Sequence, residues 1–191
     1  SRRALDALGV HASPLGELTF ENFRVPAENL IGKEGEGFKI CMWQLNQTRL
    51  SCAAGALGVA RAAKEAAVSY ANQREQFGQK IGQFQMIQDV IAQMVVHEEA
   101  ARLLVYRAAW LADRGQPNNL EVSIAKYTAA EAAAYAADGA LKILGAYGYS
   151  TEFPVERYLR DSKSYQIVEG SSNIQKLIIA GDALGYRKAN R

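Results

Sequence analysis

Over most of the chain, hydrophobic residues recur every three or four positions, which is the spacing of one face of a helix. No proline occurs between Pro26 and Pro117, and this window is rich in Ala, Leu, Gln, Glu, Lys and Arg, which favour helices. The pattern predicts three long helices, over residues 35–72, 85–114 and 120–144.

The three predicted helices differ in the faces they present. The second has one apolar stripe at helical spacing, formed by Ile87, Val90, Ile91, Met94, Ala101, Leu104, Ala108 and Leu111. The third is dense in alanine, which indicates close packing on all sides. Gly55 and Gly58 lie inside the first helix and indicate a close crossing with a neighbouring element.

Two shorter helices are predicted near the C-terminus, over residues 154–164 and 172–184. Ser172 and Gln175 have the spacing of a capping box, so the last helix should begin just after Glu169. We therefore expect an all-α fold: an antiparallel four-helix-bundle-like domain with short C-terminal helices.

The N-terminal segment has a different pattern. Leu18-Thr19-Phe20 predicts a strand, Phe23-Arg24-Val25-Pro26 predicts a turn, and no second strand is predicted anywhere. Because a lone strand is not stable in water, its partners should lie outside this chain. We expect residues 1–33 to be the end of a β-domain, an orphan β-strand arm, and residues 34–191 to be the helical domain. The alternative is an extended arm lying across the bundle.

Composition narrows the class of protein. The 22 basic and 20 acidic residues give a net charge of +2, without the basic stripe of a nucleic-acid binder. The most apolar stretch, residues 129–141, contains Glu131 and Asp138, so no membrane span is expected. No signal peptide is recognisable at the N-terminus, which makes a cytosolic setting the default.

Cys41 and Cys52 are the only cysteines. On one helix they would be separated by about 16 Å of rise, and a disulfide requires Cα atoms within about 7 Å. We expect two free thiols.

The motif inventory excludes several chemistries. His11 and His97 form neither Glu-x-x-His pairs nor His-Glu-x-x-His, so no metal site is predicted. His97 is expected to be a partly buried structural residue. The glycines at 32, 35 and 37 have the wrong order for a dinucleotide fingerprint, and no phosphate-binding loop or nucleophile elbow is present.

Two segments remain as candidates for chemistry. Glu169 lies just before a predicted helix, where the helix dipole favours an acidic residue for structural reasons alone. Partial burial would instead raise its pKa toward the range of a general base. Residues 74–78 form a turn between helices, or a cofactor or subunit contact in which Arg offers a fork for phosphate and Phe a flat face. The residues by themselves leave both pairs of explanations open.

Taken in order, the motifs resemble the acyl-CoA dehydrogenase family over essentially the whole chain. The shared motifs are Gln73-Arg74-x-x-Phe77-Gly78, Gln85, Ile143-Leu144-Gly145-x-x-Gly148-Tyr149, Arg160-Asp161 and Tyr165-Gln166-x-x-Glu169-Gly170-Ser171-x-x-Ile174-Gln175. Members are about twice this length and carry a helical domain and a β-domain before the bundle. The orphan strand would then be the end of that β-domain.

The resemblance implies an FAD-dependent enzyme that oxidises acyl-CoA thioesters to trans-2-enoyl-CoA. Glu169 corresponds to the base that removes a proton from the α carbon, while hydride leaves the β carbon for the flavin. The backbone N–H of Glu169 would hold the thioester carbonyl as negative charge develops on it. Some relatives place the base on the first long helix, but Thr48 at that position cannot serve.

The resemblance also implies binding residues and partners. The expected FAD contacts are Arg74, Gln76, Phe77 and Gln85, acting across a subunit interface, and Gly145, Ser171 and Asn173. The expected substrate contacts are Asn46, Arg49, Val168 and Gly170. The family is usually a tetramer, a dimer of dimers built through this bundle, and passes electrons to electron-transferring flavoprotein. The expected compartment is the bacterial cytoplasm or, in a eukaryote, the mitochondrial matrix.

Some positions depart from the family pattern. Lys142 and Ala146 differ from the signature around Gly145. Asn46 replaces a common Asp, which leaves room for an acyl-carrier-protein substrate. Val168 replaces a common Tyr, which predicts a wider acyl pocket for a branched or cyclic group.

Other functions stay open beside this one. One is a non-catalytic helical oligomerisation module; another is an acyl-CoA oxidase or acyl-carrier-protein dehydrogenase. We expect the isolated 191 residues to be inactive, because they lack most of the flavin and acyl pocket.

Overall fold

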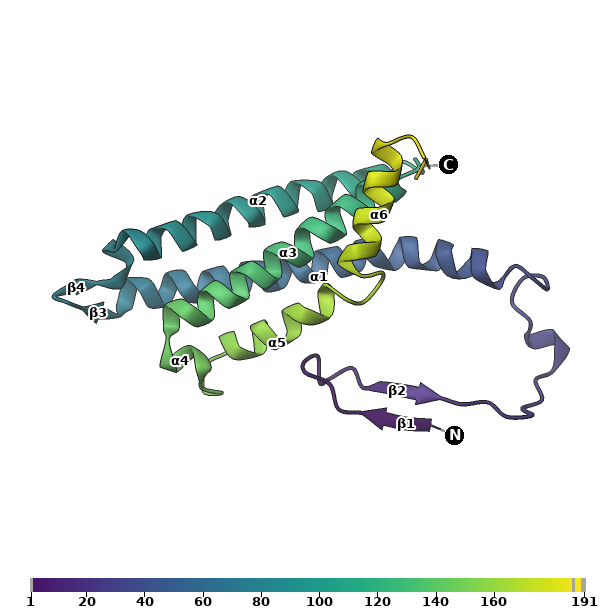
Figure 1. Cartoon of the computed structure of the whole chain (residues 1–191), viewed down its shortest axis with the longest axis horizontal. Coiled ribbons are helices and arrows are strands. Elements are labelled where there is room, and N and C mark those ends of the chain that lie inside the picture. Colours follow the sequence, from purple (N-terminus) through teal and green to yellow (C-terminus); the bar gives the residue numbers. More distant parts are fainter. Residues whose placement is uncertain (1, 187, 190–191) are drawn as a thin grey trace.

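The computed structural model describes residues 2–186 and 188–189 (Figure 1). Residue 1 of the predicted N-terminal segment (1–33) and residues 187 and 190–191 of the predicted helical domain (34–191) lie outside the described part. The helices are α1 (Gly37–Gln73), α2 (Gln85–Asp113), α3 (Asn119–Leu144), α4 (Ala146–Tyr149), α5 (Val155–Tyr165) and α6 (Ser172–Ala183). All five predicted helices are confirmed within two residues at each end, and α4 is an additional short turn of helix.

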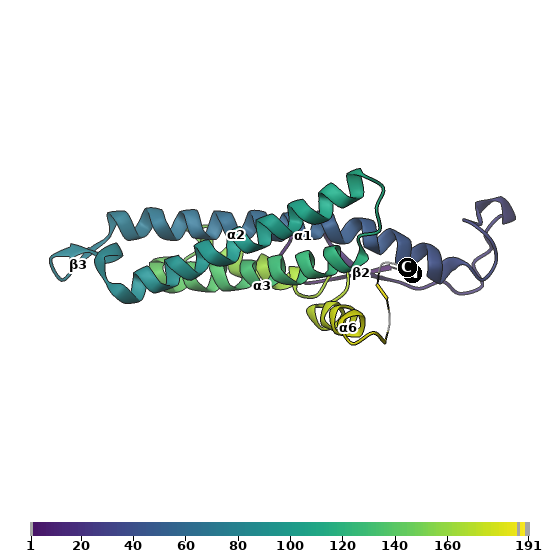
Figure 2. The same cartoon turned by 90° about the horizontal axis from the view of Figure 1, so that it is seen from above.

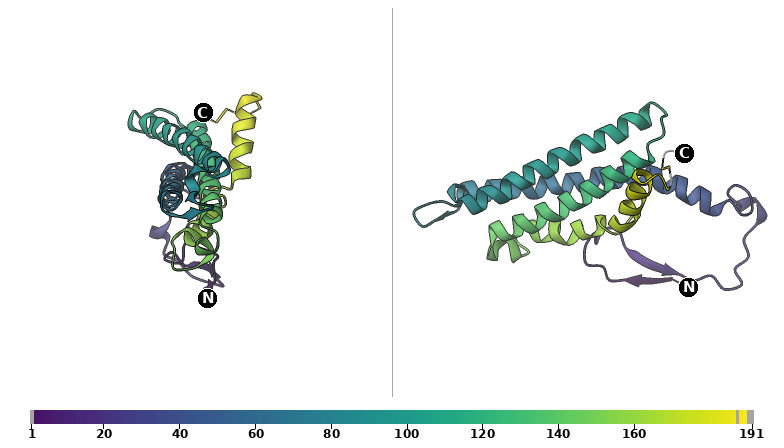
Figure 3. Two further views of the ribbon diagram at one scale, coloured as in Figure 1. Left: turned by 90° about the vertical axis from the view of Figure 1, so that its left-hand side faces the viewer. Right: turned by 45° about the horizontal axis from the view of Figure 1, so that its top comes forward.

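The helices α1, α2, α3 and α5 form the bundle (Figure 1). Each reverses the direction of the one before it, so α1 and α3 lie side by side and parallel, while α2 and α5 run antiparallel to them. An end-on view shows α6 standing off the side of this bundle, where it packs against α3 (Figure 3). The predicted four-helix-bundle-like architecture is confirmed.

Small side chains allow α1 and α3 to approach closely. The buried face of α1 consists almost entirely of alanines spaced three or four residues apart, namely Ala53, Ala56, Ala60, Ala63, Ala67 and Ala71. Fifteen of the 26 residues of α3 are buried, which confirms its predicted packing on all sides. The core is therefore an alanine-rich contact between two parallel helices.

The other predicted packing features are mostly confirmed. The α2 stripe faces the core, with Met94, Ala101 and Ala108 buried. A Cβ atom at Gly55 would lie 2.9 Å from the Tyr165 hydroxyl oxygen, so this glycine does mark a close approach. Gly58 has open space around it within the described chain, so the same prediction is wrong there.

The prediction of a single unpaired strand is wrong. Strands β1 (Arg2–Leu5) and β2 (Leu15–Leu18) form an antiparallel hairpin, with Arg2 opposite Leu18 and Leu5 opposite Leu15. The sequence pattern missed β1 because both strands are almost wholly exposed, so neither shows an alternation of apolar and polar positions. The assignment of residues 1–33 to a β-domain stays a prediction.

The remaining short elements connect the helices. They are the 3₁₀ turns η1 (Ala27–Asn29) and η2 (Ile81–Gln83) and the two-residue strands β3 (Glu75–Gln76) and β4 (Gln79–Lys80). The turn between β3 and β4 is Phe77-Gly78, and both residues have positive φ, 52° and 78°.

The N-terminal arm docks on α5 through its hairpin loop. The Val10 N–H donates to Asp161 Oδ1 at 2.6 Å, and Arg160 Nη1 donates to the Leu8 carbonyl at 3.3 Å. Between them, a Cβ atom at Gly9 would lie 2.6 Å from Asp161 Oδ1. The absence of a side chain at Gly9 therefore lets the arm lie directly against α5.

Overpacking the alanine contact should destabilise the fold. Ala63→Leu places three extra carbons where Ala63 is fully buried, and we expect the free energy of unfolding to fall by about 1–3 kcal/mol. Ala112→Leu, at an exposed alanine of α2, is the control and should change stability little. Urea unfolding of both variants measures this, and equal midpoints would contradict the packing argument.

Removal of the Asp161 carboxylate should release the arm. Asp161→Ala deletes the acceptor of the Val10 N–H, whereas Asp161→Asn retains an acceptor oxygen. A hydrogen bond to a charged group contributes about 1.5–3 kcal/mol. We therefore expect limited proteolysis within residues 6–14 to accelerate about tenfold or more in Asp161→Ala and much less in Asp161→Asn. Unchanged cleavage in both variants would show that other contacts hold the arm.

Candidate active site

The loop between α5 and α6 presents Glu169. After α5 ends, the N–H groups of Ile167 and Val168 both donate to the Ser164 carbonyl at 2.9 Å. Glu169 and Gly170 then adopt positive φ, 55° and 89°, and turn the chain into α6. A positive φ is uncommon for glutamate, and strained backbone persists where surrounding contacts hold it in place.

The predicted capping box is wrong, although α6 does begin where expected. The N-cap is Ser171, whose side chain accepts from the Ile174 N–H at 3.5 Å. Ser172 instead donates to Glu131 Oε1 at 2.8 Å, and the Gln175 amide donates to the Gly170 carbonyl at 2.9 Å. Both side chains are used by tertiary partners that the spacing could not reveal.

The Glu169 side chain contacts the N-terminal third of α1. It is half-buried, and its Oε2 accepts a hydrogen bond from the Thr48 hydroxyl at 2.5 Å. Thr48, which cannot itself serve as a base, is thus in contact with the candidate base. Among the residues described, no acceptor bonds the backbone N–H of Glu169. That donor is free to bind a ligand.

Three buried side chains donate hydrogen bonds to the backbone carbonyls of Glu169 and Gly170. Arg49 Nε donates to the Glu169 carbonyl at 3.0 Å, and Lys126 Nζ donates to the Gly170 carbonyl at 2.8 Å. Gln175 adds the bond to Gly170 described above. The exposed fractions of Arg49, Lys126 and Gln175 are 8%, 0% and 0%.

Burial lowers the pKa of both cations. It lowers the pKa of the Arg49 guanidinium, and the nearby Glu169 carboxylate partly offsets that effect. Burial likewise lowers the pKa of Lys126. Sequence reasoning missed Lys126, although a lysine inside an alanine-dense helix was a signal that could have drawn attention to it.

Glu131 closes the base of the same loop. Its carboxylate accepts from Gln166 Nε2 at 2.9 Å and from the Ser172 hydroxyl at 2.8 Å. The Ser172 N–H also donates to the Gln166 carbonyl at 2.9 Å. Helix α3 therefore holds both ends of the loop through Glu131 and its apex through Lys126.

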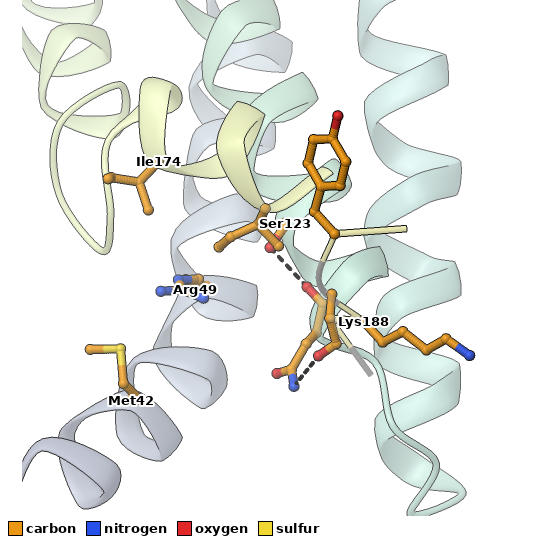
Figure 4. Close-up of a pocket in the computed structure, with 9 residues that line it drawn as sticks. Met42, Arg49, Ser123, Ile174 and Lys188 are labelled. Atoms are coloured by element: carbon orange, nitrogen blue, oxygen red, sulfur yellow. Dashed lines mark hydrogen bonds between the residues drawn. The ribbon is translucent and has the colours of Figure 1, made fainter. Parts of the chain in front are cut away.

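Two of the cavities near this loop are lined by Glu169 itself or by Arg49, which binds the Glu169 carbonyl. One, of about 640 Å³, is bounded by the N-terminal arm, α5 and the segment Ile167–Glu169, so Val168 and Glu169 both line it. The other, of about 540 Å³, lies between α1, α3 and α6 and is shown with its lining residues, including Arg49 and Ile174, in Figure 4. The first cavity has room for an extended part of a ligand that is bound at Glu169.

The predicted substrate and cofactor residues close to Glu169 are placed as follows. Gly170 forms the turn itself, and a Cβ atom there would lie 2.7 Å from Gln175 Nε2. Asn46 lies on α1, where its Nδ2 is 3.4 Å from Asn118 Oδ1 and its buried Oδ1 has no partner in the described chain. Ser171 caps α6, and Asn173 is exposed in its first turn.

The other predicted cofactor residues lie at the opposite end of the bundle. Arg74, Gln76, Phe77, Gln85 and Gly145 are all exposed and gather around the β3–β4 hairpin and the end of α3 (Figures 1 and 2). Along α1, 26 residues separate Thr48 from Arg74, a rise of about 39 Å. Within one chain the two groups are not brought together.

Aromatic contacts order this distal group. The Phe77 ring is 93% exposed and packs edge-on against Phe84, with 6.1 Å between centroids. The Arg74 guanidinium lies 5.9 Å from the centroid of the Tyr147 ring. These side chains form an exposed surface of one cation, two amides and a flat ring.

Several further predictions can be compared with the structure. Cys41 and Cys52 are both free. His97 is half-buried and packs edge-on against Tyr135 at 4.8 Å, as expected of a structural residue. No helix in the described chain has the length and hydropathy required to cross a membrane. The described residues contain no cluster of three or more His, Cys, Asp or Glu side chains suited to a metal ion.

Comparison with known proteins identifies the family. The sequence pattern of the acyl-CoA dehydrogenase C-terminal domain matches residues 35–184. Glutaryl-CoA dehydrogenase of Desulfococcus multivorans is 58% identical over 98% of this chain and 48% of its own. A structure of glutaryl-CoA dehydrogenase in complex with glutaryl-CoA superimposes with a TM-score of 0.97, at 56% identity over 100% of this chain and 49% of that one.

A chain in a structure described as the electron transferring flavoprotein of Acidaminococcus fermentans matches with a TM-score of 0.92, at 44% identity over 95% of this chain and 48% of that chain. This chain spans about half the length of the relatives it matches. The resemblance drawn from the ordered motifs is thus confirmed by sequence and by fold: the chain belongs to the acyl-CoA dehydrogenase family, and residues 35–184 are its C-terminal domain.

Proposed function

We propose that this chain supplies the catalytic base of an FAD-dependent enzyme that oxidises acyl-CoA thioesters to trans-2-enoyl-CoA, acting as the C-terminal half of that enzyme. The observation that carries the proposal is the geometry at Glu169. A half-buried carboxylate lines a cavity of about 640 Å³, on a backbone held by buried donors, beside a peptide N–H without an acceptor in the described chain.

Glu169 removes the proton from the α carbon of the thioester. The Thr48 hydroxyl orients the carboxylate through the bond to Oε2, which leaves Oε1 to face the substrate. As the proton leaves, negative charge develops on the thioester oxygen, and the Glu169 N–H is the donor that stabilises it. The charge accumulates only during the reaction, so this donor lowers the barrier rather than merely tightening binding.

The residues present fit FAD by the chemistry of their donors. Arg74 offers a planar fork suited to pyrophosphate, Gln76 and Gln85 offer amides, and Phe77 offers an exposed flat ring. Ser171 and Asn173 offer polar groups beside Glu169. When bound, FAD supplies an acceptor for the hydride that leaves the β carbon.

The two groups of cofactor residues favour a site shared between subunits. They lie at opposite ends of the bundle, so one flavin beside Glu169 would meet Arg74 only from a second chain. The expected dimer of dimers, built through this bundle, provides such an arrangement.

The proposed substrate class is an acyl thioester of CoA, with glutaryl-CoA the first to test. The relatives at 58% and 56% identity are glutaryl-CoA dehydrogenases. Val168 lines the acyl-side cavity with a small side chain, which favours a wider acyl pocket for a branched or cyclic acyl group. Arg49 lines the second cavity, and with Asn46 it would hold the CoA portion.

Electron-transferring flavoprotein is the proposed electron acceptor, as the resemblance implies. The compartment is the cytoplasm in a bacterium or the mitochondrial matrix in a eukaryote. A non-catalytic oligomerisation module would have no need of the buried donors around Glu169, and this counts against that alternative.

Replacing the base should abolish turnover but leave the flavin in place. In the complete gene product, Glu169→Gln removes the proton acceptor while preserving size, and we expect turnover to fall at least about 100-fold. Glu65→Gln, at an exposed glutamate of α1, is the control. The measurement is anaerobic bleaching of the flavin absorbance by glutaryl-CoA and by short, medium and branched acyl-CoAs.

Full activity in Glu169→Gln would assign the base elsewhere. Bleaching followed by rapid reoxidation in air would identify an oxidase. Activity on a carrier-bound thioester alone would identify an acyl-carrier-protein dehydrogenase, and a gene product without flavin would favour the oligomerisation module.

A shared flavin site predicts complementation between two inactive variants. Arg74→Ala should reduce flavin content, and Glu169→Gln should reduce turnover. If Arg74 and Glu169 act from different chains, co-expression of the two variants restores about a quarter of the wild-type activity, because half of randomly paired dimers are mixed and each contains one intact site. No recovery in purified mixed oligomers would place both residues of a site on one chain.

A further inference from the structure

Lys126 is a fully buried cation with no carboxylate partner. It has an exposed fraction of 0%, and no described acidic group forms an ion pair with it. Its Nζ donates a hydrogen bond to the Gly170 carbonyl at 2.8 Å. The fold therefore uses a buried ammonium group to bind one backbone oxygen in the loop that carries Glu169.

Burying an ammonium group lowers the stability of the fold unless its hydrogen bond compensates for the lost hydration. Burial of an ammonium disfavours its charged form, and desolvation lowers the pKa of Lys126. Cys52, Glu131 and Glu169 act in the opposite direction, while Arg49 adds to the effect of burial. A leucine or methionine would fill the same space in the alanine-rich core without this penalty.

The hydrogen bond from Lys126 stabilises a turn whose backbone conformation is unfavourable by itself. Glu169 has a φ of 55°, and residues in sparsely populated backbone regions cost about 1–3 kcal/mol each. The next peptide oxygen is the one bound by Lys126 and Gln175. If it were released, Glu169 could relax to negative φ, and its carboxylate would leave Thr48 and the cavity.

We propose that Lys126 is a positioning residue for Glu169, which keeps the catalytic loop in the strained turn that directs the carboxylate at the substrate. This inference rests on the proposed function of Glu169 as the base. It goes beyond that function because it assigns part of the catalytic geometry to α3, which supplies neither the base nor its direct partner Thr48.

Of the three donors Arg49, Lys126 and Gln175, Lys126 is the one whose removal is easiest to interpret. Arg49 also lines the cavity of about 540 Å³, so its removal would alter ligand binding as well. Gln175 is buried within α6, next to the loop it holds. Lys126 lines neither of the two cavities proposed to hold the substrate, so its replacement removes no side chain from their walls and acts on them only through the loop.

The test compares Lys126→Met with Lys126→Gln and Lys64→Met in the complete gene product. Methionine keeps the shape of lysine without a donor, and glutamine restores an amide donor of shorter reach. Lys64 forms an ion pair between α1 and α2 with the buried Glu98, away from the loop, so Lys64→Met controls for loss of stability. The first readout is hydrogen–deuterium exchange in residues 164–172.

We expect faster exchange at the Ile167, Val168 and Ser172 amides in Lys126→Met and no change there in Lys64→Met. These amides are bonded within the loop, so their exchange reports its opening. The second readout is steady-state kinetics. We expect kcat to fall about 10- to 100-fold in Lys126→Met, with KM and flavin content within about twofold, and partial recovery in Lys126→Gln.

Two results would overturn the proposal. One is unchanged exchange in the loop of Lys126→Met; the other is faster exchange with unchanged kcat, which would make Lys126 an anchor without catalytic consequence. If the wild-type protein turns over no acyl thioester, the proposed function fails and with it the catalytic role of Lys126, while the exchange data still decide whether Lys126 holds the loop.

Discussion

The close contact between α1 and α3 is the constraint on which the candidate site depends. Alanines on the facing surfaces let two parallel helices approach closely enough for polar side chains from both to reach one loop. Thr48 and Arg49 come from α1, and Lys126 and Glu131 come from α3. Larger side chains in this contact would separate the helices and move these groups out of hydrogen-bonding distance, because interiors pack without spare volume.

The loop itself shows how a folded protein can hold a carboxylate in an unfavourable backbone conformation. Glu169 has a left-handed conformation, and a Cβ atom at Gly170 would lie 2.7 Å from Gln175 Nε2. Donors from three helices compensate by binding the Glu169 and Gly170 carbonyls. In this turn the carboxylate and a backbone N–H that has no acceptor among the described residues belong to one residue, and our proposal gives them the roles of proton acceptor and oxyanion donor.

The distal surface around Arg74 and Phe77 poses a different problem. Its side chains are exposed, and Arg74 and Phe77 contact the rings of Tyr147 and Phe84. An exposed phenylalanine at the tip of a hairpin contributes nothing to the core of its own chain. In our proposal, the groups exposed at each end of the bundle act together with another chain or with the rest of the enzyme.

The sequence alone was sufficient for the five main helices, the close packing of the alanine-dense third helix, the free cysteines and the family, because these depend on local periodicity, composition and the order of motifs. It did not reveal the β1–β2 hairpin, since two exposed strands have no apolar alternation, nor the true cap of α6, since Ser172 is bound by Glu131 instead. Only the tertiary structure showed that Lys126, 43 positions before Glu169, reaches the loop that carries it. That contact depends on how closely two helices pack, a quantity that no single stretch of sequence contains.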